Sequence, residues 1–154
     1  MQIAEVMTPG PIACTPDTTV AEVAHLMWEG DCGVLPVVQD RLLIGIVTDR
    51  DLFIALATRD AKASELTVGA VARPAPVTCS PRDDVHQAMS KMKSHRVRRL
   101  PVVEKDGTLV GIVSMNDLLL AIAPETALGG TVVDTLQKIS EHQLPVPVAK
   151  TATA

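Results

Sequence analysis

Aromatic side chains are almost absent from this chain. Its 154 residues include one Trp, one Phe and no Tyr. Proteins that grip single-stranded nucleic acid stack the bases on aromatic rings. The composition therefore argues against that class of protein. It also implies that any site for an adenine base is lined by aliphatic side chains.

Cysteine is scarce as well. Cys14, Cys32 and Cys79 are odd in number and show no C-x-x-C spacing. They suit reduced thiols better than disulfide bonds or a zinc site, so we expect no metal.

Long apolar runs and one-sided charge are also lacking. No apolar run approaches the roughly 20 residues of a membrane span, and no Lys or Arg precedes an apolar stretch in residues 1–16. We therefore expect neither a membrane span nor a signal peptide, and we expect a cytoplasmic location.

The net charge of −4 creates no field that would attract nucleic acid or an anionic membrane. With 47% apolar and 21% charged residues, the chain should fold as one domain or as two small ones sharing a core.

The chain contains an internal repeat. The sequence VMTPGPIACTP at residues 6–16 corresponds to VARPAPVTCSP at residues 71–81, and LPVV occurs at residues 35–38 and 100–103. After one inserted residue, LIGIVTDRDL corresponds to LVGIVSMNDL. A unit of about 60 residues buries too little surface to be stable alone, so we expect the two copies to pack together.

These matches divide the chain into four parts. We assign residues 1–58 to the first repeat, 59–70 to a linker, 71–123 to the second repeat, and 124–154 to a C-terminal docking helix with a frayed tail. Apolar residues at helical spacing between positions 132 and 139 predict the docking helix, and Pro145 and Pro147 should end it.

In each copy an early extended segment is followed by a predicted helix. Thr15-Pro16 and Ser80-Pro81 are expected to cap these helices, because a hydroxyl can bind free N–H groups and proline is accepted in the first turn. Apolar residues then recur at i, i+3, i+4 and i+7, which predicts a buried stripe on each helix. The stripes consist of Val20, Val23, Ala24 and Met27 in the first copy, and of Val85, Ala88, Met89 and Met92 in the second.

Two short buried strands follow each of these helices. They cover residues 34–38 and 42–47 in the first copy and residues 100–103 and 109–113 in the second, and each pair should form a hairpin. A further helix starts at about Asp49 and at about Met115, and residues 67–71 open the second copy with a short helical turn. This alternation predicts a mixed α/β sandwich of small sheets packed with helices.

The same polar motif follows the sequence GIV in both copies. Thr48 is followed by Asp51 at the third position, and Ser114 by Asp117. One interpretation is a capping box that starts a helix. The other is a ligand site, in which the acid accepts the hydroxyls of a ribose and free N–H groups attract phosphate. The glycine at positions 45 and 111 favours the ligand, because a missing Cβ allows close approach to the backbone.

Together, the motifs P-x-P-h-x-C-[TS]-P, LPVV and G-I-V-[TS]-x-x-D-L resemble the cystathionine-beta-synthase (CBS) domain in tandem, the Bateman module. The resemblance covers residues 6–122. In that family two repeats pack about a pseudo-twofold axis, and adenosine-containing ligands such as AMP, ADP, ATP or S-adenosylmethionine occupy clefts between them. The resemblance implies this symmetric sandwich, an adenosine-type ligand with no required cofactor, and a homodimer. Met115 departs from the strongest form of the pattern, and we expect it at the surface or in a lid.

The resemblance also implies which residues contact a ligand. The acid of each motif would hold the ribose and the hydroxyl its phosphate side, while the LPVV strands and the segments before the first helices would enclose the base. Small buried thiols would explain Cys14 and Cys79 equally well. The full set is Ile12, Cys14, Val34, Pro36, Thr48, Arg50, Asp51, Val77, Cys79, Arg98, Arg99, Pro101, Ser114, Asn116 and Asp117.

A basic cluster is confined to the second copy and comprises Lys91, Lys93, Arg96, Arg98 and Arg99. The two lysines lie off the apolar stripe and should form a solvated face. The last two arginines lead into the LPVV strand, where a guanidinium requires a bidentate oxyanion partner. The run resembles the H-R-L-P-V sequence of nucleotide-sensing gamma subunits of the AMP-activated kinase, whose basic residues hold phosphates. We expect Arg98 and Arg99 to bind phosphate.

Three functions remain open. The first is a regulatory module in which an adenine nucleotide changes the packing of the repeats and signals to an unidentified effector protein in trans. The second is a nucleic-acid binder using residues 91–99, against which the acidic total and the missing aromatics argue. The third is a structural interaction module with empty clefts. We expect no enzyme, because the sequence shows no nucleophile with an adjacent base and no P-loop.

Overall fold

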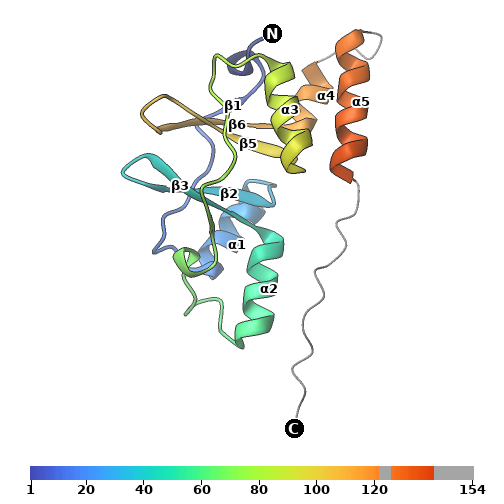
Figure 1. Ribbon diagram of the computed structural model, residues 1–154. Coiled ribbons are helices and arrows are strands. Elements are labelled where there is room, and N and C mark those ends of the chain that lie inside the picture. Colours follow the sequence, from blue (N-terminus) through green and yellow to red (C-terminus); the bar gives the residue numbers. More distant parts are fainter. Residues whose placement is uncertain (122–125, 141–154) are drawn as a thin grey trace.

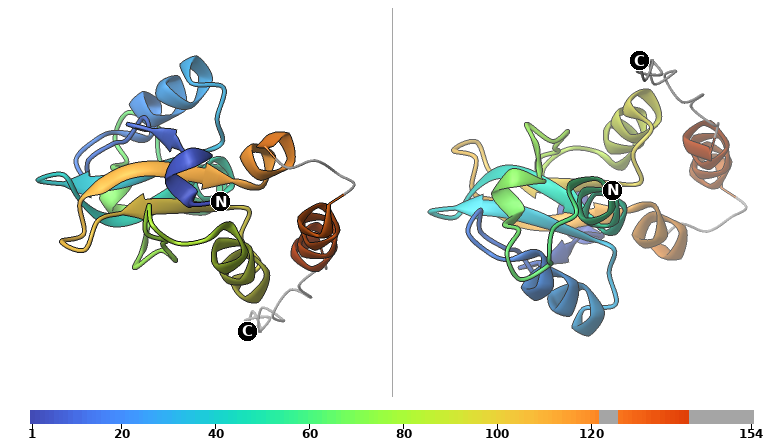
Figure 2. Two further views of the ribbon diagram at one scale, coloured as in Figure 1. Left: turned by 90° about the horizontal axis from the view of Figure 1, so that it is seen from above. Right: turned by 90° about the horizontal axis from the view of Figure 1, so that it is seen from below.

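The computed structural model describes residues 1–121 and 126–140. The molecule has two halves, each with a small antiparallel sheet and helices packed beside it (Figure 1). Views from above and below place the helices around the outside of the sheets (Figure 2). The predicted mixed α+β architecture of two related repeats is confirmed. The first half contains α1 (Val20–Glu29), β2 (Val34–Gln39), β3 (Leu42–Thr48) and α2 (Asp49–Arg59), and the second contains α3 (Val85–His95), β5 (Arg99–Val103), β6 (Leu109–Ser114), α4 (Met115–Ala121) and α5 (Ala127–Ser140).

Both predicted hairpins are present. Strand β2 pairs with β3, and β5 pairs with β6. In the first hairpin only Asp40 and Arg41 lie between the strands, and both have positive φ angles, 51° and 69°. This is the left-handed backbone of a tight two-residue turn, formed here without glycine. The two hairpin tips contact each other, since the Leu43 N–H donates to the Gly107 carbonyl at 3.1 Å.

The first helix of each repeat starts later than predicted. Helix α1 is capped by Thr19, which forms a capping box with Glu22, and α3 is capped by Asp84. The prediction that Thr15 and Ser80 cap these helices is therefore wrong. The Thr15 N–H donates to the Thr18 hydroxyl at 3.0 Å, so the local hydrogen bonding forms a turn ahead of the helix.

All four residues of the predicted stripe are buried on α3. On α1 three of the four are buried, and Ala24 is exposed. The second helices start at Asp49 and Met115 as expected, and the short helical turn η2 (Val68–Ala70) is present as well.

The segments that open the two repeats are exchanged between the halves. We call residues 3–9 and 68–74 the lead segments; they contain η1 (Ile3–Glu5) with β1 (Thr8–Pro9), and η2 with β4 (Arg73–Pro74). Strand β1 pairs with β6 of the second half, whereas β4 pairs with β3 of the first. Each half in space therefore combines parts of both sequence repeats, although the repeat boundaries along the chain were drawn as continuous blocks.

This exchange explains the glycines that precede the polar motifs. A Cβ atom on Gly111 would lie 2.5 Å from the sulfur of Met7 and 3.2 Å from the Thr8 carbonyl oxygen, and one on Gly45 would lie 3.0 Å from the Arg73 carbonyl oxygen. The interpretation that these glycines admit a ligand is wrong. The missing Cβ atoms instead allow β1 to approach Gly111 and β4 to approach Gly45.

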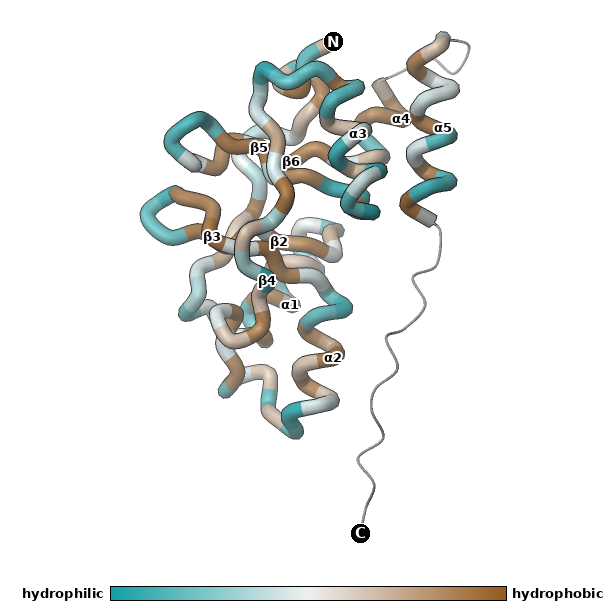
Figure 3. The backbone as a smooth tube through the Cα atoms, in the orientation of Figure 1, coloured by the Kyte–Doolittle hydropathy of each residue, from teal (hydrophilic) through white to brown (hydrophobic). Residues whose placement is uncertain are grey.

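Each half has its own apolar core. Ile3 from the first lead segment is fully buried in the core of the second half, among Met89, Leu100 and Leu118. The strands of the hairpins carry much of the apolar sequence, while the hairpin turns are polar (Figure 3).

The predicted docking helix is present as α5, which packs mainly against α3 and also against α4. Its Val132 and Ile139 are buried in the core of the second half. The expected helix stop at Pro145 and Pro147 and the expected frayed tail lie outside the described residues. Within residues 1–121 and 126–140, the structure has no helix whose length and apolarity would let it cross a membrane.

The exchange predicts a stability effect at the N-terminus. Replacing Ile3 with Ala should lower the free energy of unfolding by about 2 to 5 kcal/mol, because it removes fully buried methyl groups from the core of the second half. Urea unfolding followed by far-UV circular dichroism measures this difference. The matched control is Ile54→Ala, at a side chain that is 44% exposed, which should change it by about 0.5 kcal/mol or less. An equal effect of the two substitutions would contradict the exchange.

Candidate ligand-binding cleft

A cavity of about 320 Å³ lies where the first lead segment and the two hairpins meet. One wall is formed by the residues that follow β1 and by the start of β2, and the other by β6 and the start of α4. Seven of the predicted contact residues line this cleft: Ile12, Val34, Pro36, Arg99, Ser114, Asn116 and Asp117. Seven further residues line the cleft that the sequence motifs do not indicate, namely Thr8, Pro11, Gly30, Asp31, Cys32, Leu35 and Ile112.

Asp117 uses one carboxylate oxygen to start α4. Its Oδ2 accepts hydrogen bonds from the Ser114 N–H at 2.7 Å and from the Ser114 hydroxyl at 2.8 Å, and its own N–H donates back to Ser114 Oγ at 3.2 Å. The capping interpretation of the motif is therefore confirmed. Within the part of the chain that the structure describes, Oδ1 of Asp117 has no hydrogen-bond partner. It remains a charged acceptor in a residue that lines the cleft.

Asp51 forms the same cap in the first repeat but differs at its other oxygen. The Thr48 N–H and hydroxyl donate to its Oδ2 at 3.2 and 2.7 Å. Its Oδ1 accepts from Nε and Nη2 of Arg73 at 3.0 and 2.5 Å, and the Asp51 side chain is 9% exposed. Burial raises the pKa of this carboxyl, but the hydrogen bonds from Thr48 and the Arg73 guanidinium outweigh it and hold the pKa below its usual value of 3.8.

Of the two arginines that were expected to bind phosphate, one lines the cleft and both line a cavity that shares residues with it. Arg99 lines the cleft directly, and together with Arg98 it also lines an adjoining cavity of about 250 Å³. Leu136 of α5 contributes to the wall of this second space. Met115 lines it too but is only 2% exposed, so the expectation of a surface or lid residue is wrong; its side chain is part of the core.

Cys14 and Cys79 are buried thiols at equivalent positions. Their sulfur atoms lie 3.7 and 3.9 Å from the carbonyl oxygens of Pro36 and Pro101. Burial raises the pKa of Cys14 to about 11 and that of Cys79 to about 12, which keeps both thiols neutral. Neither residue lines the cleft, whereas Cys32 does.

The remaining predicted contacts lie away from this cleft. Thr48 and Arg50 stand at the start of α2, where Arg50 is exposed. Val77 packs against the core of the second half, and Pro101 is buried in β5. With Asp51, these residues mark the position that the repeat assigns to a second, equivalent cleft.

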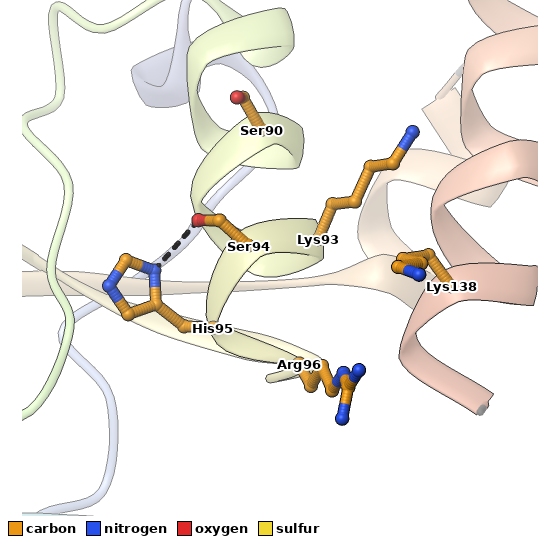
Figure 4. A pocket seen from close by; sticks show the side chains of 6 residues that line it. All are labelled: Ser90, Lys93, Ser94, His95, Arg96 and Lys138. Atoms are coloured by element: carbon orange, nitrogen blue, oxygen red, sulfur yellow. Dashed lines mark hydrogen bonds between the residues drawn. The ribbon is translucent and has the colours of Figure 1, made fainter. Parts of the chain in front are cut away.

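The rest of the basic cluster is engaged in part by acidic side chains. Lys91 pairs with Asp83 at 2.9 Å, and Lys93 pairs with Asp134 of α5 at 2.5 Å. The lysines expected on a solvated face are 39% and 41% exposed and form these ion pairs. A cavity of about 490 Å³ between α3 and α5 is lined by Ser90, Lys93, Ser94, His95, Arg96 and Lys138, with a Ser94 to His95 hydrogen bond of 2.9 Å (Figure 4).

The described residues contain no group of three or more His, Cys, Asp or Glu side chains that could hold a metal ion.

Comparison with known proteins matches this arrangement to one family. The family model for the CBS domain matches twice, at residues 3–58 and 68–124. A CBS domain-containing protein of Bacillus subtilis, YhcV, is 33% identical over 116 residues, which cover 75% of this chain and 81% of that protein.

Two solved structures of CBS proteins share the fold. The CBS domain protein PAE2072 from Pyrobaculum aerophilum, complexed with AMP, has a TM-score of 0.73 at 26% identity and covers 87% of this chain and 99% of its own. CBSX2 in complex with AMP has a TM-score of 0.69 at 27% identity and covers 78% of this chain and 94% of its own.

Domains of this kind are regulatory rather than catalytic units. The paired matches, together with two halves that each pair a hairpin with a capped helix, establish that this chain belongs to the CBS domain family as a tandem pair, a Bateman module.

Proposed function

We propose that this chain is a regulatory module that binds an adenine nucleotide, or a related adenosyl ligand such as S-adenosylmethionine, in the cleft at Asp117. The observation that carries the proposal is that Asp117, whose Oδ1 has no hydrogen-bond partner among residues 1–121 and 126–140, lines the same cavity as Arg99. A carboxylate accepts the two hydroxyls of a ribose, and a guanidinium binds phosphate oxygens. The two charges therefore match the two polar parts of a nucleotide.

The base fits the remaining wall. Ile12, Val34, Pro36, Leu35 and Ile112 supply an aliphatic surface between the polar groups. At about 320 Å³ the cleft is at the small end of the range for ligand sites, and the adjoining space at Arg98 adds room for phosphates. The AMP complexes of PAE2072 and CBSX2 support an adenosine ligand.

The proposed regulation is based on the fact that residues of both halves line the cleft. A ligand in this cleft contacts the β2 side and the α4 side at once, and its phosphates approach α5 through Leu136. Binding changes the packing of these parts only if the ligand has different affinity for two packings. Helix α5 and the surface beside it then carry the state of the cleft to an effector protein in trans. The three cysteines are free, which suits a reducing compartment such as the cytoplasm.

We further propose that the module forms a homodimer through the first half. In the second half α5 covers α3 and α4, whereas the face between α1 and α2 is open and contains a groove of about 560 Å³. The only two aromatic residues of the chain, Trp28 and Phe53, line this groove and are 84% and 71% exposed. Exposed aromatic side chains in one groove are typical of a protein interface.

The ribose contact is tested with Asp117→Asn. This variant can still accept a hydrogen bond from Ser114 and so keeps the start of α4, but it loses the charge offered to the ribose. We expect AMP binding, measured by isothermal titration calorimetry, to weaken at least about tenfold, or about 1.4 kcal/mol. Asp17→Asn, at an exposed residue before α1, should bind as the unchanged protein does.

Further titrations separate the alternatives. Arg99→Gln should weaken AMP more than adenosine, because adenosine has no phosphate for the guanidinium to bind. Unchanged AMP affinity in Asp117→Asn would contradict the assigned site. Absence of AMP and S-adenosylmethionine binding to the unchanged protein would leave a structural module with empty clefts. DNA or RNA binding that weakens steeply with salt would favour the nucleic-acid hypothesis.

The dimer is tested with Trp28→Glu. A buried charge in an apolar interface is strongly unfavourable, so we expect size-exclusion chromatography with light scattering to show a monomer. Val133→Glu on α5, at a side chain that is 54% exposed, is the control and should remain dimeric. A monomeric unchanged protein, or dimerisation insensitive to Trp28, would contradict this interface.

A further inference from the structure

The strand pairing identifies Arg73 and Thr8 as equivalent residues. In the second half Thr8 of β1 lies opposite Ile112 of β6, and in the first half Arg73 of β4 lies opposite Ile46 of β3. Ile112 and Ile46 occupy the same place in the repeated GIV sequence. Each residue therefore stands beside the polar motif of its own half, but one is a small hydroxyl and the other a long cation.

Their effect on the neighbouring acid differs. Thr8 lines the cleft at Asp117 and leaves Oδ1 of that acid without a partner among the described residues. Arg73 donates two N–H groups to Oδ1 of Asp51. Because Oδ2 of Asp51 already accepts from Thr48, neither oxygen of this carboxylate is left for a ribose.

We propose that Arg73 closes the second cleft by occupying the ribose acceptor, so that the chain binds a single adenosine ligand, at Asp117. The inference rests on the proposed function. A ribose at Asp51 has to displace a permanently charged donor with neutral hydroxyls, or leave its own hydroxyls without an acceptor. Arg73 thereby decides which of two duplicated sites is used.

Calorimetric titration of the full chain with AMP tests this. The unchanged protein should bind one AMP per chain. In Arg73→Thr, which places the Thr8 residue type at the equivalent position, we expect a second AMP to bind with a dissociation constant at least about tenfold above the first, because Val34 stands in the first half where Arg99 stands in the second. Adding Asp51→Asn to that variant should remove the second event and leave the first. Arg82→Thr, at an exposed arginine before α3, is the matched control and should bind one AMP.

The reverse substitution at Thr8 tests the same idea through a loss of AMP binding, so the test does not depend on creating a new site. Thr8→Arg brings a guanidinium next to Oδ1 of Asp117 and should weaken AMP binding at least about tenfold. In the double variant Thr8→Arg with Arg73→Thr, one AMP should bind again, and its affinity should depend on Asp51 rather than on Asp117. Arg73→Gln, which keeps much of the side-chain length without the charge, provides a second opening variant, and thermal unfolding confirms that each protein is folded.

The outcomes separate this inference from the function on which it rests. Two AMP molecules bound by the unchanged protein, with one lost in Arg73→Thr, would show that Arg73 holds phosphate instead and would overturn the inference while the nucleotide function stands. One AMP bound by both Arg73→Thr and Arg73→Gln would overturn it as well. If neither the unchanged protein nor any variant bound AMP or S-adenosylmethionine, the proposed function itself would be overturned.

Discussion

The structure depends on the aspartate that caps the second helix of each repeat, Asp51 or Asp117. One of its two carboxylate oxygens is engaged in the helix cap. In both repeats Oδ2 accepts from the residue that ends the strand, which starts the following helix and fixes its position against the hairpin. Oδ1 is then held at a defined place by the same bonds. A binding acceptor that is oriented by a structural contact loses little freedom on meeting a ligand. Capping and ligand binding are therefore not competing explanations of Asp117.

The exchange of the lead segments determines what surrounds that oxygen. Because β1 pairs with β6, Thr8, Pro11 and Ile12 are brought to the cleft. Without the crossing, this cleft would lack one side. The glycine of each GIV sequence belongs to the same arrangement, since it allows the crossing strand to approach. The interface between the repeats and the ligand site thus share one set of backbone contacts.

Sequence patterns predicted what is encoded in neighbouring residues. Both hairpins, the second helix of each copy and the capping of α2 and α4 follow from motifs within a few positions, and the repeat follows from the second occurrence of the same motifs. The predicted starts of the first helices are too early because Thr15-Pro16 has the residue types of a helix start, whereas Thr15 to Thr18 form a turn and the capping box follows it at Thr19 and Glu22. The exchange and the contact of Arg73 with Asp51 join residues far apart in the chain, and no local pattern reports them.

The two copies differ, so that the proposed ligand site depends on the acid of the second half and the candidate interface lies on the helices of the first. The second half contains Arg98 and Arg99 and is covered by α5, so its helices are not available for association through that face. The first half has an uncovered helical face with both aromatic residues, and its acid is paired with Arg73. A symmetric pair could report a ligand only through the sum of two equal sites. An asymmetric pair can hold the ligand in one place and transmit its effect from another, because the strands that form the cleft wall join both halves.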